Sequence, residues 1–266
     1  QWIEAKISTE RLSVKDSEPT YLEVVRTQHG PVIAGEPQNG FGICFSHTGT
    51  NSGTPWMDTV HALLHSKNAD ETELALKDWT EPVNNFVYAD VNGDYGYRYR
   101  GRIPIRNSAN AWAPVPGWTG KHEWRGEIPF EELPHIRNPE NGFVVTCNNA
   151  PTTADYPHYI NTYFAPDWRA QRINTDLENI ELHSAKINTM SDVHADCISI
   201  PAQIFVEKTK EIMSSDSLIN QACEKLQQWD YRMNRESTAA LIYSAARSSF
   251  YKLIIHDQLG NLASEA

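Results

Sequence analysis

The sequence predicts an α+β fold with a β-rich first half and a helical second half. Two observations support this. Strand-like runs of Val and Ile bounded by turn sequences occupy residues 1–151, whereas apolar residues near the helical spacing of 3.6 dominate residues 152–266. With 40% hydrophobic and 21% charged residues, the composition is that of a globular protein. We therefore expect residues 1–151 to be mainly β with a short helical insert, and residues 152–266 to be mainly α.

Two strand pairs are predicted in the first half. Leu22–Ile33 is rich in Val and Ile and is interrupted by the turn sequence His29-Gly30-Pro31. Phe86–Ile105 predicts a β-hairpin, because Asn92-Gly93 supplies the positive φ angles of a tight turn. Each pair needs only a local turn to form.

A long irregular region follows the hairpin. Residues 106–142 are dense in Pro, Gly and Trp and show no helical period, so we expect connections that cross a surface. Gly142–Thr146 then returns to a strand-like pattern.

Helical spacing begins between Thr54 and Trp79, and Asn68 with Glu71 three residues later predicts the capped start of a second helix there. Later apolar spacing predicts four more helical segments. They are marked by Ile173, Leu177, Ile180 and Leu182, by Ile204–Met213, by Cys223–Trp229 and by Thr238–Leu259.

Charge and composition exclude several classes of function. The formal net charge is −11, from 34 acidic and 23 basic residues, and no run of Lys and Arg could follow a phosphate backbone, so nucleic-acid binding is not expected. No apolar run is long enough for a membrane span, and the start shows no signal-peptide pattern. The cysteines lack metal-site spacing, so we expect buried thiols, with their disulfide status open: Cys44, Cys147, Cys197 and Cys223.

Two patterns imitate metal sites. Asp90–Asp94 resembles the start of a calcium-binding EF-hand loop, but Gly101 stands where a bidentate Glu is required, so we interpret it as a hairpin turn. His61 and His65 share one helical face, but Ala62 replaces the general-base Glu of a zinc protease. No metal ligand is predicted from either pattern.

Several stretches, taken in order, resemble sequences of the penicillin acylase (penicillin amidase) family, and the resemblance covers nearly the whole chain. The matching stretches are Arg26–Ile33, Asn85–Tyr97, Pro114–Trp118, Trp124–Gly126, Ile128–Phe130, Asn138–Pro139 with Gly142, Thr146–Pro151, Tyr156–Pro157, Trp168–Ile173, Met190–Asp192 with Asp196, and Leu226–Asp230.

The resemblance implies a four-layer αββα N-terminal nucleophile hydrolase, made as one precursor, a zymogen, that cuts itself into two chains. The new N-terminal Ser of the larger chain attacks the amide carbonyl, with its own α-amine as base. Asn148 is implied as a donor to the oxyanion, a contribution of typically about 10² to 10³ in rate. Arg172 is implied to lie near the active site and to orient that Asn and the amine.

Alternatives remain for both residues. Asn148 could close a strand-end turn through its own side chain. Arg172 could form a surface or interchain salt bridge. His29 lies in a matching stretch, but the sequence does not show whether it contacts a substrate or holds a turn, so it is not assigned a catalytic role.

The family nucleophile lies upstream of the first matching stretch, and the chain starts at Gln1 without Met, so we expect an internal segment of the large (β) chain that is inactive alone. The parent enzyme is expected to hydrolyse an N-acylated small molecule of the penicillin, acyl-homoserine lactone or lipopeptide type. Its expected partners are that substrate and the rest of the precursor, namely the small chain and the N-terminal part of the large chain. The alternative is a non-catalytic binding or structural module that retains the scaffold.

The resemblance also implies a periplasmic or extracellular location. It allows a structural calcium ion in the parent enzyme, held in part by a backbone carbonyl near Ala111 and an Asp in the region of Tyr159–Asn161. No Asp stands in that region, so no cofactor is predicted for this chain.

Overall fold

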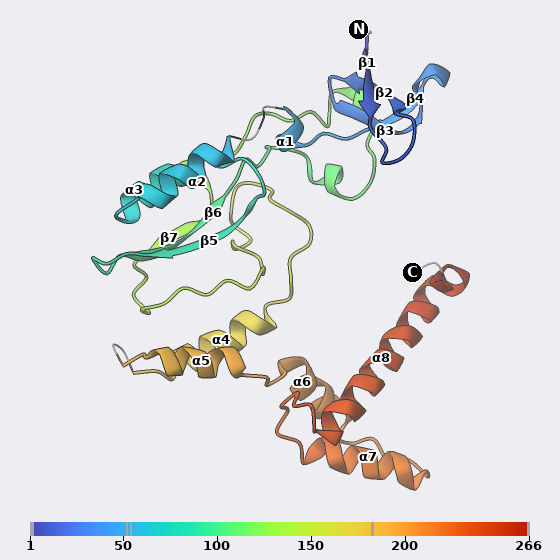
Figure 1. Cartoon of the computed structure of the whole chain (residues 1–266). Coiled ribbons are helices and arrows are strands. Elements are labelled where there is room, and N and C mark those ends of the chain that lie inside the picture. Colours follow the sequence, from blue (N-terminus) through green and yellow to red (C-terminus); the bar gives the residue numbers. More distant parts are fainter. Residues whose placement is uncertain (1–2, 52, 54, 182–183, 265–266) are drawn as a thin grey trace. The chain divides into compact units, whose positions relative to one another are not determined.

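The computed structural model describes residues 3–51, 53, 55–181 and 184–264 of the chain. They form two compact units, Gln1–Ala165 and Pro166–Ala266 (Figure 1). Every strand of the described residues lies in the first unit, and the regular elements of the second unit are helices. The predicted α+β class, with a β-rich first half and a helical second half, is confirmed.

The first sheet has four antiparallel strands in the order β1-β2-β3-β4. Their bounds are β1 Lys6–Leu12, β2 Thr20–Thr27, β3 Gly30–Glu36 and β4 Phe41–Cys44. The predicted turn joins β2 to β3, and the N–H of His29 donates to Oγ1 of Thr27 at 3.1 Å. Gly30 has a φ of 109°, and a Cβ there would lie 2.2 Å from the carbonyl oxygen of Phe45, so only glycine fits.

Three helices follow this sheet: α1 Thr48–Asn51, α2 Trp56–His65 and α3 Ala69–Leu76. The predicted cap of α3 is confirmed, because the N–H of Glu71 donates to Oδ1 of Asn68 at 2.9 Å. In return, Oε2 of Glu71 accepts from the N–H of Lys67 at 2.8 Å, so side chain and backbone satisfy one another at the helix start.

The second sheet contains β5 Asn84–Ala89, β6 Tyr95–Arg100 and β7 His135–Arg137, again antiparallel. The predicted hairpin of β5 and β6 is confirmed. Its turn is held by the Asp90 carboxylate, which accepts from the N–H groups of Asn92 and Asp94 and also from that of Ala69 at the start of α3. In Figure 1 α3 lies over β5 and β6, so Asp90 ties the turn to the helix that covers the sheet.

Arg98 of β6 lies beneath α3 and is only 5% exposed. Its Nη2 donates to Oε2 of Glu73 at 2.8 Å, its Nη1 donates to the carbonyl of Phe130 at 3.0 Å, and the Tyr88 hydroxyl donates to the other Glu73 oxygen. Burial alone raises the pKa of Glu73, but the bonds from Tyr88 and Arg98 outweigh it and hold that pKa below its usual value. The buried charge is therefore paired.

Residues 106–142 are irregular as predicted, apart from short 3₁₀ turns and strand β7. They pack on a core of Ile103, Ile128, Leu133 and Ile160. The prediction of a strand at Gly142–Thr146 is wrong. In the part of the chain that the structure describes, residues 143–146 find no partner strand, and an extended segment becomes a strand only when another one pairs with it.

The second unit contains α4 Trp168–Glu178, α5 Ile187–Ala195, α6 Ile200–Thr209, α7 Ser217–Gln227 and α8 Thr238–Leu259. Buried residues of α6, α7 and α8 meet around Trp229 and form the unit 2 core: Ala202, Val206, Leu226, Trp229, Ala239, Ala240 and Tyr243. The predicted bounds of the last helix are confirmed, and Ser237 caps it by accepting from the N–H of Ala240.

Other predicted helix bounds need correction. The helix predicted to reach Ile180 ends at Glu178, and Leu182 lies outside the described residues. The helix predicted over Ile204–Met213 begins earlier, because Ser199 caps Ile200–Thr209. Likewise Asp216 starts α7 well before Cys223. In both cases a capping side chain, and not the apolar spacing, fixes the start.

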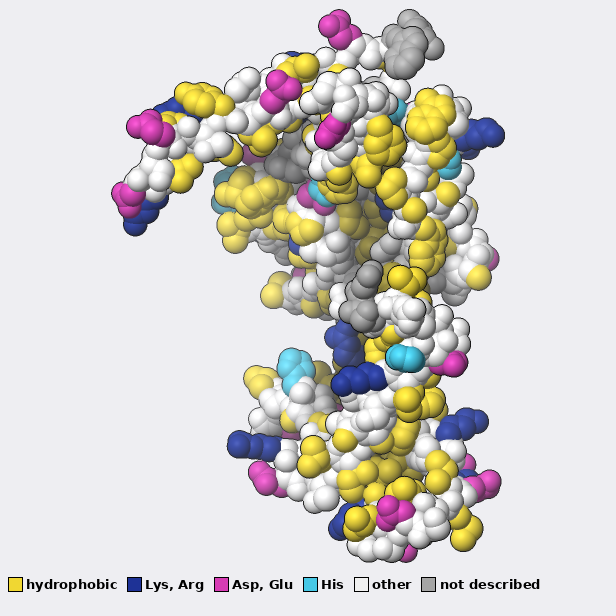
Figure 2. All heavy atoms as spheres, turned by 90° about the vertical axis from the view of Figure 1, so that its right-hand side faces the viewer, with side chains coloured by type: hydrophobic (Ala, Val, Ile, Leu, Met, Phe, Trp, Pro, Cys, Tyr) yellow, Lys and Arg dark blue, Asp and Glu magenta, His cyan; other side chains and the backbone are white. Residues whose placement is uncertain are grey.

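Hydrophobic side chains are widely exposed on both units (Figure 2). In the first sheet Ile7 is 61% exposed and Leu22 is 51% exposed. The strand register places these two side chains on opposite faces, since Ile7 pairs with Val25 and Leu22 pairs with Glu10. Apolar residues on both faces are typical of a sheet that is covered on both sides.

Within the described residues, every helix is too short or too polar to cross a bilayer.

We predict that Glu73→Gln lowers the free energy of unfolding by about 1 to 3 kcal/mol, because the buried Arg98 loses its anionic partner. The matched control is Glu131→Gln, which breaks the exposed ion pair with Lys77 and leaves the urea midpoint nearly unchanged. Equal midpoints for the two variants would contradict the structural importance of the Arg98 pair.

A pH series tests the same pair. Because the folded-state pKa of Glu73 is lowered, its stabilisation is fully present above the unfolded value of about 4.3 and is lost as the pH falls through the folded value. Below about pH 4.3 we expect the urea midpoint of the wild type to fall more steeply than that of Glu73→Gln. Parallel curves would show that Glu73 does not titrate as described.

Candidate active site

Asn148 lies in a turn with a left-handed backbone, at a φ of 62°, which Asn tolerates better than most residues. The N–H of Cys147 donates to Oδ1 of Asn149 at 3.1 Å, and the N–H of Ala165 donates to the Asn148 carbonyl at 2.9 Å. Cys147 is buried, whereas Asn148 is exposed. The turn is thus closed by the neighbouring Asn149 side chain and by a main-chain bond.

Arg172 lies on α4 and binds two carboxylates. Its Nε donates to Oδ2 of Asp196 at 2.5 Å, and its Nη2 donates to Oδ1 of Asp176, one turn along the same helix, at 2.5 Å. Nη2 of Arg232 lies 3.7 Å from the other Asp196 oxygen. The hydrogen bond that Arg172 donates to Asp196 is the main cause that raises the pKa of Arg172, so the guanidinium stays charged. These ion pairs are within the chain, neither interchain nor isolated.

Asn148 belongs to the first unit and Arg172 to the second. Each is fixed by contacts within its own unit. Three residues to which the sequence analysis gave no role are central to these contacts: Asn149, Asp176 and Asp196. Asp176 could have been found from its helical i, i+4 spacing to Arg172, whereas nothing local points to the pairing with Asp196.

His29 holds a turn. Its Nδ1 lies 3.6 Å from Oε2 of Glu123, and its ring packs against Gly117, where a Cβ would come within 3.2 Å of Nε2. The β2–β3 turn is therefore attached to the irregular region after β6.

The structure gives the two metal-like patterns other roles. Nδ1 of His65 lies 2.8 Å from the carbonyl oxygen of His61, within one helical turn. Asp90 is used by backbone N–H groups, as described above. Among the described residues, no group of three or more His, Cys, Asp or Glu side chains could hold a metal ion.

The calcium site allowed by the resemblance is not supported by the residues present. Ala111 ends a 3₁₀ turn, and the Tyr159 hydroxyl hydrogen bonds with Thr162, with no carboxylate in Tyr159–Asn161. No step is therefore assigned to calcium in this chain.

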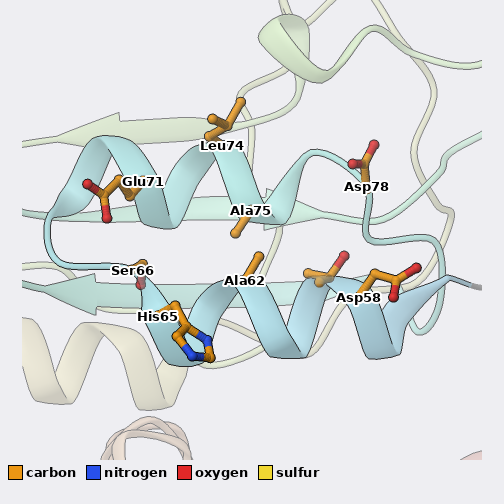
Figure 3. Close-up of a pocket in the computed structure, with 9 residues that line it drawn as sticks. Asp58, Ala62, His65, Ser66, Glu71, Leu74, Ala75 and Asp78 are labelled. Carbon is orange, nitrogen blue, oxygen red and sulfur yellow. The ribbon is translucent and has the colours of Figure 1, made fainter.

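A shallow groove runs between α2 and α3 (Figure 3). Ala62 and Ala75 face one another across it, with Asp58 and Asp78 near one end and Glu71 near the other. It contains neither Asn148 nor Arg172, and its carboxylates are exposed.

The expectation of buried thiols holds only for Cys147. Cys44, Cys197 and Cys223 are free and half-buried. Cys197 donates to Oδ1 of Asn234 at 3.1 Å, beside the Asp196 ion pairs.

Comparisons with known proteins agree with the sequence resemblance. The sequence model described as Penicillin amidase matches residues 1–266. The Penicillin acylase 2 proenzyme of Pseudomonas sp. (strain SE83) is 32% identical over 249 residues, which cover 92% of this chain and 32% of that protein. Penicillin G acylase of Escherichia coli is 30% identical over 164 residues, covering 59% of this chain and 18% of that protein. An acyl-homoserine lactone acylase QuiP of Pseudomonas fluorescens is 24% identical over 286 residues, covering 100% of this chain and 34% of that protein.

Among solved structures, a thermostable penicillin G acylase from Alcaligenes faecalis superposes with a TM-score of 0.68 at 21% identity, covering 86% of this chain and 42% of that one. This match shows the N-terminal nucleophile hydrolase fold. The chain spans about a third or less of the length of these curated relatives. It belongs to the penicillin amidase family, whose named relatives are amide-hydrolysing acylases.

Proposed function

We propose that this chain is an internal segment of the large chain of an autoproteolytic amidohydrolase precursor. The parent enzyme cleaves the acyl amide bond of an N-acylated small molecule, of the penicillin, acyl-homoserine lactone or lipopeptide type, and acts in the periplasm or outside the cell. Family membership supports the reaction type, and the names of the relatives support the substrate class.

The partner that completes the site is the remainder of the same precursor. Support comes from the exposed apolar side chains on both faces of the β1–β4 sheet, such as Ile7 and Leu22, which a finished domain covers. The rest of a precursor of that size is large enough to cover the sheet, because this chain matches only 32% of the Penicillin acylase 2 proenzyme.

In the proposed reaction, the N-terminal Ser of the large chain, outside these residues, attacks the amide carbonyl carbon. Its α-amine takes the hydroxyl proton and passes it to the leaving nitrogen as the C–N bond breaks. Water then hydrolyses the acyl-enzyme ester and releases the acid. In both steps a negative charge develops on the former carbonyl oxygen, where preorganised N–H donors stabilise it.

Asn148 is the proposed side-chain donor to that oxygen. The single observation that carries this role is the fixed left-handed turn, in which Asn149 and Ala165 close the backbone while Asn148 remains exposed. An amide on a fixed backbone needs little reorganisation during the reaction, which is what gives an oxyanion donor its effect.

Arg172 is the proposed positioning residue. Its guanidinium is held by Asp176 and Asp196, so it keeps its charge and its orientation. In the proposed enzyme it lies near the active site and helps to orient Asn148 and the nucleophile's amine.

Substitution of Asn148 in the full-length precursor tests its role. Asn148→Gly accepts the positive φ without strain and removes the amide, whereas Asn148→Ala removes the amide and adds about 1 to 2 kcal/mol of backbone strain. We expect both variants to lower kcat by about 10² to 10³, per mole of processed enzyme, on a chromogenic phenylacetyl or fatty-acyl amide.

Comparing the two variants separates the effect of the backbone conformation on kcat from the effect of the side-chain amide. Near wild-type kcat in Asn148→Gly, with loss in Asn148→Ala, would show that only the turn matters and would end the oxyanion assignment.

The segment hypothesis has its own test. The purified 266-residue chain is expected to show no hydrolysis of the same amides, because the proposal places the nucleophile and much of the acyl pocket elsewhere in the precursor. The control is the processed full-length enzyme at equal concentration. Turnover by the isolated chain would contradict the proposal.

A further inference from the structure

Arg106, in the irregular region of the first unit, is a half-buried cation. Its Nη2 donates to the carbonyl of Ile160 at 3.3 Å, and its guanidinium carbon lies 5.6 Å from the centroid of the Tyr159 ring. Its Nε is buried and has no hydrogen-bond partner among the described residues. The ion pairs within that part of the chain involve other arginines and leave Arg106 without a carboxylate.

The two nearest buried or half-buried arginines of β6 show how such a charge is stabilised elsewhere in the unit. Arg98 binds a carboxylate, as described above. Arg100 packs against two aromatic rings, with its guanidinium carbon 3.8 Å from the centroid of Trp79 and 4.6 Å from that of Phe86. Arg106 has one ring, close to the limit of about 6 Å for such contacts. A partly desolvated charge without a counter-charge is unfavourable, so Arg106 needs an anionic partner.

The backbone on both sides of the Arg106 contact is held in place. The N–H of Ile105 donates to the carbonyl of Gly126 at 2.9 Å, and the N–H of Arg125 donates to that of Ile105 at 2.9 Å. Ile160 is buried in the same core as Ile103. Because the two segments are fixed to one another, the anionic partner has to come to the guanidinium from outside the described residues.

Exposed aromatic side chains indicate what kind of partner lies there. Trp112, a few residues after Arg106, is 76% exposed, and Tyr163, shortly after Ile160, is 79% exposed. Large aromatic side chains together with Arg are typical of surfaces that bind another part of a protein. The chain matches only 32% of the Penicillin acylase 2 proenzyme, so the rest of a precursor of that size is large enough to cover these segments.

We propose that Arg106 forms an ion pair with an Asp or Glu side chain of the rest of the precursor. The proposal rests on the proposed function, in which this chain is a segment of a longer polypeptide. Nη1 of Arg106 makes no hydrogen bond within the described residues, and a carboxylate binds guanidinium N–H groups more strongly than a neutral acceptor does. The pair neutralises the half-buried charge and attaches the Arg106–Ile160 contact to the covering part of the precursor.

Carbodiimide crosslinking of the full-length, processed enzyme identifies the partner. Arg106→Lys keeps the positive charge and supplies an amine that a carbodiimide joins to a contacting carboxylate. We expect peptide mapping by mass spectrometry to find the introduced lysine joined to an Asp or Glu outside residues 1–266. The wild-type enzyme, treated in the same way, is the control and gives no crosslink at this position.

Thermal stability gives a second readout. Arg106→Gln keeps an N–H donor for the Ile160 carbonyl and removes the charge. We expect it to shorten the half-life of the folded, processed enzyme at elevated temperature, followed by tryptophan fluorescence, about tenfold. Arg106→Lys is expected to retain more of the half-life because it keeps the charge. The matched control is Arg235→Gln, at a side chain that is 96% exposed, and it leaves the half-life nearly unchanged.

The outcomes that would overturn the inference are specific. They are an introduced lysine joined only to carboxylates of residues 1–266 or to none, and a wild-type half-life in Arg106→Gln. Amide formation between that lysine and added phenylacetate, in place of a crosslink, would also overturn it, because the position would then bind a small carboxylate. Neither readout uses amide hydrolysis, so failure here leaves the proposed reaction standing, and a failed oxyanion assignment leaves the Arg106 pair standing.

Discussion

The hydrogen bond from the N–H of Ala165 to the carbonyl of Asn148 is the constraint on which the proposed chemistry depends. It closes the loop between them and holds Asn148 in a left-handed conformation, which Asn tolerates better than most residues. Buried Cys147 on one side and Asn149 on the other complete the restraint. A side-chain amide can act as an oxyanion donor only if its backbone is fixed in this way, since reorganisation during the reaction would cancel its benefit.

The elements that the sequence predicts well are those determined by neighbouring residues. The Asn92-Gly93 turn, the Asn68–Glu71 cap and the helix Thr238–Leu259 each depend on a few adjacent side chains, and all three appear as expected. The failures involve distant partners. Residues 143–146 look like a strand but find no partner among the described residues, whereas β7 is only three residues long and exists because β6 lies beside it.

The same distinction between neighbouring and distant partners holds for the candidate site. Asn148 and Arg172 were identified through ordered motifs, and their alternatives could not be resolved from the residues alone. In the structure the side chain of Asn149 accepts the hydrogen bond that closes the turn, and Arg172 forms salt bridges with Asp176 and Asp196 within its own unit. Asp196 could not have been found from spacing, because its pairing with Arg172 depends on how α4 and the segment after α5 pack together.

In the proposed reaction Asn148 donates a hydrogen bond to the oxyanion that forms as the amide bond is cleaved. The most direct measurement is a crystal structure of the processed full-length enzyme with an arylalkyl boronic acid, which forms a tetrahedral adduct with a nucleophilic serine. We predict that Nδ2 of Asn148 lies at about 2.7 to 3.1 Å from the adduct oxygen that occupies the oxyanion position. A separation beyond about 3.5 Å, with that oxygen bound by other donors, would contradict it.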